Sequence, residues 1–196
     1  MVQTSDWNSY ASRLSALDNR WWRRWIDVQA PYRAHLRGLH MGFTLDVGAG
    51  VGRNLAHLGG NGVGVEISAQ AVRAMRERGL RAFEPKAFLA SEFAKPGLFD
   101  SLLIAHVLEH MPRPEAIRLV AENMKYVKRG GRIVLITPQE AGQRSDPTHV
   151  AFLDAKASSE ILRTLGINVE RTYSFPFPRY LGRIFKHNET VVIGRV

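Results

Sequence analysis

The stretch LDVGAGVGRN, residues 45–54, decides how the rest of the chain folds. An apolar run at residues 43–47, interrupted only by Asp46, leads into three glycines at alternate positions, and residues that can start a helix follow. Glycine permits positive φ angles and lets the backbone approach a ligand without a Cβ in between. A helix that begins directly after such a loop offers free N–H groups and a partial positive charge to an anionic group. The stretch therefore predicts a strand, a tight loop and a helix that together bind a ligand.

A carboxylate at a fixed distance from this loop narrows the class of ligand. Glu66 ends a second apolar run, residues 62–65, and lies twenty residues after Asp46. At this spacing a carboxylate reaches the two hydroxyls of a ribose. The dinucleotide fingerprint G-x-G-x-x-G does not fit, because the third glycine comes one place early and Arg53 stands where that pattern has glycine. The loop and Glu66 together predict a nucleoside-binding site that differs from a dinucleotide site.

The same residues resemble the class I S-adenosylmethionine-dependent methyltransferases. The first motif of that family is similar to residues 45–52, the second to residues 64–68, and the motif of the fourth strand to residues 99–111. The resemblance runs in order from about residue 43 to residue 152. It implies S-adenosyl-L-methionine as cofactor. It also implies a Rossmann-like α/β fold, with a mostly parallel sheet, an antiparallel last strand and helices on both faces.

The resemblance further implies which residues contact the cofactor. The glycine loop would pass beneath the methionine part and the ribose, Asp46 would organise the loop or receive the ammonium group through water, and Glu66 would take both ribose hydroxyls. The usual acidic residue after the third strand is not evident, so backbone contacts or stacking on Phe88 would have to recognise adenine. The cofactor-binding residues predicted in this way are Asp46, Gly48, Ala49, Gly50, Gly52, Glu66, Ile67, Phe88, Ala105 and His106.

Three histidines are candidates for the base that an acceptor hydroxyl needs. Histidine titrates near neutral pH and is the natural general base. His106, His110 and His149 all follow the fourth or fifth predicted strand. His149 is the first choice, because the loop of residues 146–149 leaves the carboxyl edge of the sheet beside the cofactor. His106 is the second, at the end of the fourth strand, where it should face the sulfonium.

Some of these histidines also have the spacing of metal ligands. His106, Glu109 and His110 stand at i, i+3 and i+4, and could converge with His149 if that turn is helical. Some methyltransferases of ubiquinone synthesis, and the small-RNA terminal 2′-O-methyltransferases, look similar, with Glu-x-x-Glu-His holding a divalent ion. Here His106 replaces the first Glu, and imidazole-rich ligation suits Zn, Mn or Fe better than Mg. Val-Leu-Glu-His also occurs in metal-free members, and we prefer that alternative.

The length and composition of the chain limit the classes of protein to which it can belong. At 196 residues the chain is expected to be a single methyltransferase domain, with a helical lid at residues 1–40 and a Rossmann-like core at residues 41–196. The absence of cysteine excludes disulfides and thiolate metal sites. No signal peptide and no apolar run that could span a bilayer are evident, so a cytoplasmic location is expected. The net charge of +9 favours an anionic partner, but the arginines are scattered, so a nucleic-acid partner is not favoured.

Apolar periodicity and turn residues place the elements. A helix is expected at residues 5–29, and its three clustered tryptophans either pack it onto the core or form a lid over the acceptor. Alternating strands and helices then predict a parallel sheet. Strands are expected at residues 43–47, 62–66, 81–84, 101–105, 132–137, 168–174 and 190–195, and helices at residues 32–39, from about 53, and at 68–78, 114–127 and 155–165. Residues 85–97 and 138–148 are expected to be irregular, and the aromatic insert at 175–180 to be a surface loop, an acceptor wall or a dimer surface.

The function predicted from the sequence is O-methylation of a hydroxyl on a saccharide, such as a methylated mannose oligosaccharide, or on another small metabolite. The residues expected to contact this acceptor are Trp22, Trp25, Tyr32, Asp146 and His149. Three alternatives remain open: an RNA 2′-O-methyltransferase, a quinone or phenol O-methyltransferase, and a non-catalytic cofactor-binding protein. A monomer or a homodimer is expected.

Overall fold

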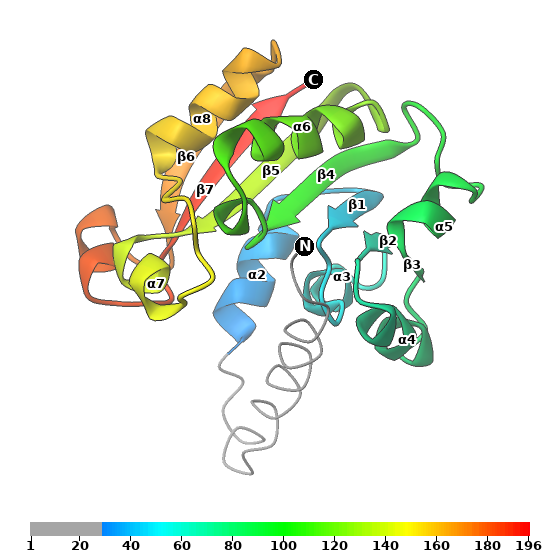
Figure 1. Ribbon diagram of the computed structural model, residues 1–196, viewed down its shortest axis with the longest axis horizontal. Helices are drawn as coiled ribbons and strands as arrows, with labels where there is room; N and C mark the ends of the chain where they lie inside the picture. The colour runs from blue at the N-terminus through cyan, green and yellow to red at the C-terminus, as the bar shows by residue number, and fades with distance from the viewer. Residues whose placement is uncertain (1–28) are drawn as a thin grey trace.

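Seven strands form one sheet in the computed structural model, which describes residues 29–196 (Figure 1). Across the sheet the strands run in the order β3-β2-β1-β4-β5-β7-β6. Their bounds are β1 (Thr44–Val47), β2 (Gly62–Val65), β3 (Ala82–Phe83), β4 (Phe99–Ala105), β5 (Val127–Pro138), β6 (Asn168–Phe175) and β7 (Glu189–Arg195). Neighbouring strands are parallel from β3 to β5, and β7 is antiparallel to both β5 and β6. The predicted Rossmann-like sheet with an antiparallel last strand is therefore confirmed.

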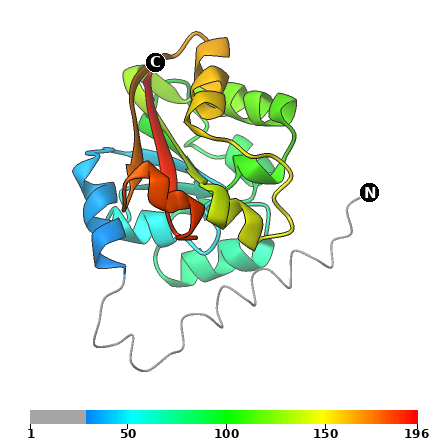
Figure 2. The same cartoon turned by 90° about the vertical axis from the view of Figure 1, so that its left-hand side faces the viewer.

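The helices cover both faces of this sheet. They are α2 (Ala30–Gly38), α3 (Arg53–His57), α4 (Ala69–Glu77), α5 (Pro85–Leu89), α6 (Arg113–Met124), α7 (Glu140–Ser145) and α8 (Ala155–Thr164), with short 3-10 helices η2 (Leu108–His110) and η3 (Arg179–Arg183). Along β4 the side chains alternate between two cores. Leu102 and Ile104 pack with the residues of α6 and α8, whereas Leu103 packs with those of α2. Figure 2 shows α2 on one side of the sheet and α6 and α8 on the other.

Local sequence signals account for several helix ends. The Ser68 hydroxyl accepts a hydrogen bond from the Ala71 N–H at 3.3 Å and caps α4, as predicted, and Gly79 follows that helix with φ +76°. Asp154 caps α8 in the same way, through the Ala157 N–H at 2.8 Å. Tyr126, predicted to be helical, lies beyond the end of α6, because β5 begins at the next residue and continues through the two glycines.

Two segments predicted to be irregular contain short helices. Residues 85–97 begin with α5, which starts at a proline that is well suited to the first helical turn. Residues 138–148 contain α7, which packs beside η3. Trp22, Trp25 and nearly all of the helix predicted at residues 5–29 lie outside the described residues. No helix within residues 29–196 is long and apolar enough to cross a membrane.

The register of the strands brings the predicted site segments to one edge. Val47 at the end of β1 pairs with Val65 of β2, and Ala105 at the end of β4 pairs with Ile136 of β5. Because β7 is antiparallel, its first residue, Glu189, lies at the carboxyl end of β5. In open α/β sheets ligands bind at this edge. The segments that follow β1, β2, β4 and β5 therefore share one end of the sheet with the insert between β6 and β7.

Candidate active site

The glycine loop after β1 is held closely on one side and open on the other. The N–H groups of Gly48 and Ala49 donate to the Val65 carbonyl at 2.8 and 3.2 Å. Gly48 has φ +73°, and a Cβ there would lie 2.3 Å from Val107, so the segment after β4 leaves room only for glycine. Gly50 has φ +55°, and a Cβ placed on it would have no atom within 4 Å. The loop thus presents its backbone to open space at Gly50.

Glu66 joins this loop to the start of the next helix. One carboxylate oxygen accepts from the Gly50 N–H at 2.9 Å, and the other accepts from the Ser68 N–H at 3.0 Å. A carboxylate oxygen has two lone-pair sites, so each oxygen keeps one for a ligand hydroxyl. Ile67, directly after it, is 58% exposed. Glu66 therefore lies where the sequence predicts it, at the glycine loop, with acceptor capacity left for a ligand.

Asp46 is a buried carboxylate beneath the loop. It is 1% exposed, and neither of its oxygens has a hydrogen-bond partner within the described residues. Burial raises the pKa of Asp46 to about 7, which outweighs the lowering influence of the Asn54 side chain, and the charge of Glu66 raises it further. A buried acceptor without a donor is costly to the folded protein unless a ligand completes it.

We expect Asp46→Asn to change how stability depends on pH. Between the ordinary aspartate pKa of 3.8 and about 7, the folded chain keeps Asp46 protonated while the unfolded chain has released the proton. Raising the pH through this window therefore lowers the stability of the cofactor-free protein. Asp46→Asn removes this contribution. The difference in melting temperature, variant minus wild type, should therefore be about 4–8 °C larger at about pH 8 than at about pH 5.

Thermal unfolding measured across this pH range tests the expectation, with the exposed Glu77→Gln as the control that should follow the wild type. Parallel curves for Asp46→Asn and the wild type would show that the carboxyl group is not held protonated.

His106 follows β4 in a left-handed conformation, with φ +58°. Its Nε2 lies 2.8 Å from Glu189 Oε1, and its Nδ1 lies 3.3 Å from Glu109 Oε1. Although burial works against the charged ring, the two carboxylates, Glu189 most of all, raise the pKa of His106 to about 10. Both ring nitrogens face carboxylates, so His106 has no free lone pair for an acceptor proton. The sequence proposed it as a base, but the geometry is that of an ion pair.

Glu189 is a site residue that sequence reasoning did not identify. It stands 83 residues from His106 and reaches it only because β7 runs antiparallel beside β5. The signal available in the sequence was its position directly before the strand predicted at residues 190–195, which was expected to be antiparallel. A carboxylate at that position lies at the carboxyl edge, where the other candidate residues gather.

His110 and His149 form a second pair of imidazoles at the same edge. Their ring centroids lie 4.8 Å apart in an edge-to-face arrangement. The His149 Nδ1 faces the Gln143 carbonyl at 3.2 Å, and the His110 Nδ1 faces the Thr148 carbonyl at 3.3 Å. Carbonyl oxygens only accept, so the neutral tautomer that satisfies both contacts carries its proton on Nδ1 and leaves the Nε2 lone pair without a partner within the described residues.

The loop that carries His149 is tied to the segment after β4. The N–H groups of Val150 and Ala151 both donate to the Glu109 carbonyl, at 2.9 and 3.1 Å. Asp146 accepts from the Thr148 N–H at 2.9 Å and from its hydroxyl at 2.7 Å. Asp146, predicted to contact the acceptor, thus orders the turn that positions His149.

Glu109, His110 and His149 could hold a metal ion. One ligand atom from each lies within 4.8 Å of the others, but His106 is not part of this group within the described residues, because its ring is turned to Glu189. The Glu109 side chain is fully buried, and apart from the His106 Nδ1 at 3.3 Å its oxygens have no partner there. One carboxylate and two imidazoles suit a divalent transition metal. The residues present therefore fit a cation, with three of the four ligands that the sequence proposed.

Three further predicted residues are Tyr32, Ala105 and Phe88. Tyr32, on α2, donates to the Asn54 side chain at 3.2 Å and lies under the Arg53 guanidinium, which places it beside the end of the glycine loop. Ala105 is buried at the end of β4. Phe88 was wrongly predicted to stack on adenine. It is 2% exposed and packs edge to face against Tyr126, because α5 turns its ring into the core.

A family comparison agrees with this geometry. Residues 45–135 match the family described as a methyltransferase domain. The chain is similar to this family over just under half of its length. The methyltransferase match includes the glycine loop, Glu66 and the segment from His106 to His110, but it ends before His149 and Glu189. The matched part thus carries the glycine loop and Glu66, whereas His149 and Glu189 come from the C-terminal third of the chain.

Curated relatives and solved structures extend the comparison. A ubiquinone biosynthesis O-methyltransferase of Thiobacillus denitrificans is 29% identical over 151 residues, covering 64% of this chain and 61% of the relative. That of Pectobacterium carotovorum is 25% identical over 148 residues, covering 64% and 59%. The chain thus spans about 60% of the length of these relatives.

Among solved structures, a SAM-dependent methyltransferase from Archaeoglobus fulgidus matches with a TM-score of 0.66 at 18% identity, covering 84% of this chain and 93% of that one. A Haloferax volcanii putative methyltransferase, solved in complex with the activator Trm112, gives 0.69 at 15% identity, covering 97% and 96%. At these identities the structures show the shared fold of the methyltransferases.

Proposed function

We propose that this protein transfers a methyl group from S-adenosylmethionine to a hydroxyl of a small acceptor. The observation that carries the proposal is the open glycine loop bridged by Glu66, with Asp46 beneath it and two imidazoles with free Nε2 atoms at the same edge. In such a transfer the acceptor oxygen forms a bond to the methyl carbon, the carbon–sulfur bond breaks, and S-adenosylhomocysteine leaves. The sulfonium is already activated, so the protein chiefly positions the acceptor and takes up its proton.

On the cofactor side, Glu66 would accept from the ribose hydroxyls and Gly50 would leave room for the nucleoside. Asp46 would accept from the ammonium group, directly or through water, and so gain the donor that it lacks. Glu84 directly follows β3, where an acidic residue could meet the adenine amine, since the strand ends one residue earlier than predicted. His106, Ala105 and Tyr32 would lie around the methionine part.

On the acceptor side, the His149 Nε2 would receive the proton of the hydroxyl. Its Nδ1–H is oriented by the Gln143 carbonyl, and its loop is tied to Glu109. A divalent cation held by Glu109, His110 and His149 would supply a second means of lowering the pKa of a hydroxyl. With a cation bound, His149 would act as a ligand instead of a base, so the two roles exclude each other.

The acceptor that we propose is a phenolic hydroxyl, in place of the saccharide predicted from the sequence. A phenol has a pKa of about 10, below that of a sugar hydroxyl, and so loses its proton more readily to an imidazole. The relatives named as ubiquinone biosynthesis O-methyltransferases favour this class. Val150 and Phe152, exposed beside His149, offer apolar surface to an aromatic ring.

An acceptor screen tests the proposal. Release of S-adenosylhomocysteine should be detected with catechols and other phenols, and more weakly or not at all with sugars, RNA, amines or proteins. Repeating the assay after treatment with EDTA and after addition of Mn²⁺ or Zn²⁺ separates the two roles of His149. Turnover with amines but with no hydroxyl compound would contradict O-methylation, and turnover with sugars alone would return the acceptor to the saccharide class.

A further inference from the structure

The insert between β6 and β7, residues 176–188, exposes several large apolar side chains. Tyr180 is 69% exposed and Ile184 is 79% exposed, and they stand four residues apart on and just after η3. Phe177 and Phe185 are 44% and 37% exposed, with their rings 5.2 Å apart. A folded chain has no reason of its own to keep several such residues in water on one short segment, so they mark an interaction surface.

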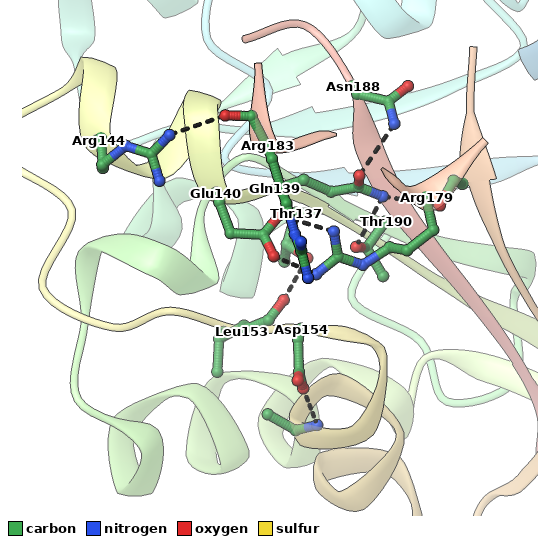
Figure 3. A network of polar contacts seen from close by, with 12 residues as sticks. Thr137, Gln139, Glu140, Arg144, Leu153, Asp154, Arg179, Arg183, Asn188 and Thr190 are labelled. Atoms are coloured by element: carbon green, nitrogen blue, oxygen red, sulfur yellow. Dashed lines mark hydrogen bonds and ion pairs between the residues drawn. The ribbon is translucent and has the colours of Figure 1, made fainter. Parts of the chain in front are cut away.

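Hydrogen bonds of the buried Gln139 and Asn188 side chains hold the insert in place (Figure 3). The Asn188 side chain donates to Gln139 Oε1 at 2.9 Å and accepts from the Phe177 N–H at 2.9 Å. Gln139 in turn donates to the Ser174 hydroxyl at 2.8 Å, and Gly182 packs so closely on Gln139 that no larger residue would fit. The apolar side chains are therefore presented by a fixed scaffold and cannot fold inward.

An ion pair and a further hydrogen bond join the insert to α7. Arg179 forms two hydrogen bonds with the Glu140 carboxylate, at 2.7 and 2.5 Å. The Arg144 guanidinium donates to the Arg183 carbonyl at 2.8 Å. Glu140, the acidic partner at this surface, is neutralised by Arg179, which holds the pKa of Glu140 below its usual range.

The charge of the insert is entirely positive. Residues 175–188 contain Arg179, Arg183 and Lys186 and no acidic residue. Arg183 and Lys186 are exposed beside the exposed Ile184 and Phe185. Within the described residues, no ion pair with a carboxylate within 4 Å engages either of them. Exposed aromatic and aliphatic residues interleaved with exposed cations are typical of segments that lie in the interface of an anionic lipid bilayer.

We propose that residues 176–187 dock this protein on the surface of an anionic phospholipid bilayer. Tyr180 and Ile184 would enter the headgroup region, and Arg183 and Lys186 would pair with the anionic headgroups. A second copy of the chain fits less well, because a two-fold contact would bring two positive surfaces together. The insert leads directly into Glu189, which contacts His106, so docking would set the active-site edge against the bilayer. The proposal concerns the surface and does not depend on the reaction.

Co-sedimentation of the full chain with phospholipid vesicles tests this proposal. We expect binding to phosphatidylcholine vesicles that contain about 30% phosphatidylglycerol, little binding to phosphatidylcholine alone, and weakening when salt rises from about 0.1 M to about 0.5 M. The double variant Tyr180→Ser, Ile184→Ser should bind at least tenfold more weakly, because docking would bury the apolar surface of both side chains. Arg183→Glu with Lys186→Glu should weaken binding by tenfold or more.

The matched control carries the same kinds of change on α5, far from the insert. Leu89 is 64% exposed and Lys86 is exposed, so Leu89→Ser with Lys86→Glu should retain the vesicle affinity of the wild type. Unchanged melting temperatures would show that every variant is folded. Vesicle binding that is unaffected by both insert variants, or equal on neutral and anionic vesicles, would overturn the proposal. So would a loss of chain–chain association in light scattering without a loss of vesicle binding, which would assign the surface to a second copy.

Discussion

Replacing Glu66 with alanine will weaken the binding of S-adenosylhomocysteine about a hundredfold. The carboxylate would accept from two ribose hydroxyls, and hydrogen bonds to a charged acceptor contribute about 1.5–3 kcal/mol each. The same change removes the acceptor of the Gly50 and Ser68 N–H groups, which hold the glycine loop beside the start of α4. Isothermal titration calorimetry with the purified chain measures the effect directly and requires no knowledge of the methyl acceptor.

Two further variants make this measurement decisive. Glu66→Gln keeps one acceptor oxygen and the size of the side chain, so we expect a smaller loss, of about tenfold. Glu77→Ala removes an exposed carboxylate at the last residue of α4 and should bind S-adenosylhomocysteine as the wild type does. Binding by Glu66→Ala within about threefold of the wild type would refute the assignment of the nucleoside site. A heat signal with a nicotinamide coenzyme in place of S-adenosylhomocysteine would refute the cofactor itself.

Replacing His149 with alanine will lower kcat by about a hundred- to a thousandfold and will leave the affinity for S-adenosylhomocysteine unchanged. Proton transfer to a positioned side chain contributes about this much to a rate. His149 lies on the loop after β5, beside His110, and is not adjacent to the glycine loop in the sequence, so the cofactor site should remain intact. Initial rates with the best acceptor from the screen, together with calorimetry, separate the two effects.

Variants of the neighbours distinguish a base from a metal ligand. If His149 acts as the base alone, Glu109→Gln and His110→Ala will keep most of the activity, and EDTA will have little effect. If the three residues hold a cation, all three variants will lose activity together with their affinity for Mn²⁺ or Zn²⁺. His40→Asn alters an exposed histidine near the amino end of β1 and serves as the control. Retention of more than about a third of the activity by His149→Ala would contradict both roles.

The nucleoside side of the site could be predicted because it depends on short-range geometry. Alternating glycines after an apolar run leave the backbone few ways to turn, and Glu66 follows the next strand at a spacing set by one helix and one loop. The structure places Asp46, Gly48, Gly50 and Glu66 together at this turn. The prediction for Phe88 was wrong because nothing in the local pattern shows that residues 85–89 form a helix that turns the ring inward.

The acceptor side depended on contacts between distant segments. Whether His106 meets a metal, a substrate or another side chain is decided by Glu189, which arrives through the antiparallel pairing of β7. His149 approaches Glu109 because two N–H groups of its loop bond to the Glu109 carbonyl. Neither contact has a signature in spacing or composition.

The sequence by itself determined the class of sheet, the glycine loop and the position of Glu66, because φ preferences and strand–helix alternation act within a few residues of each other. Only the tertiary structure decided that His106 is paired with carboxylates, that His110 and His149 converge on a buried Glu109, and that the aromatic insert is clamped with its apolar residues facing outward. These arrangements follow from the register of β7 and from the buried contacts of Gln139 and Asn188, which join segments up to 83 residues apart.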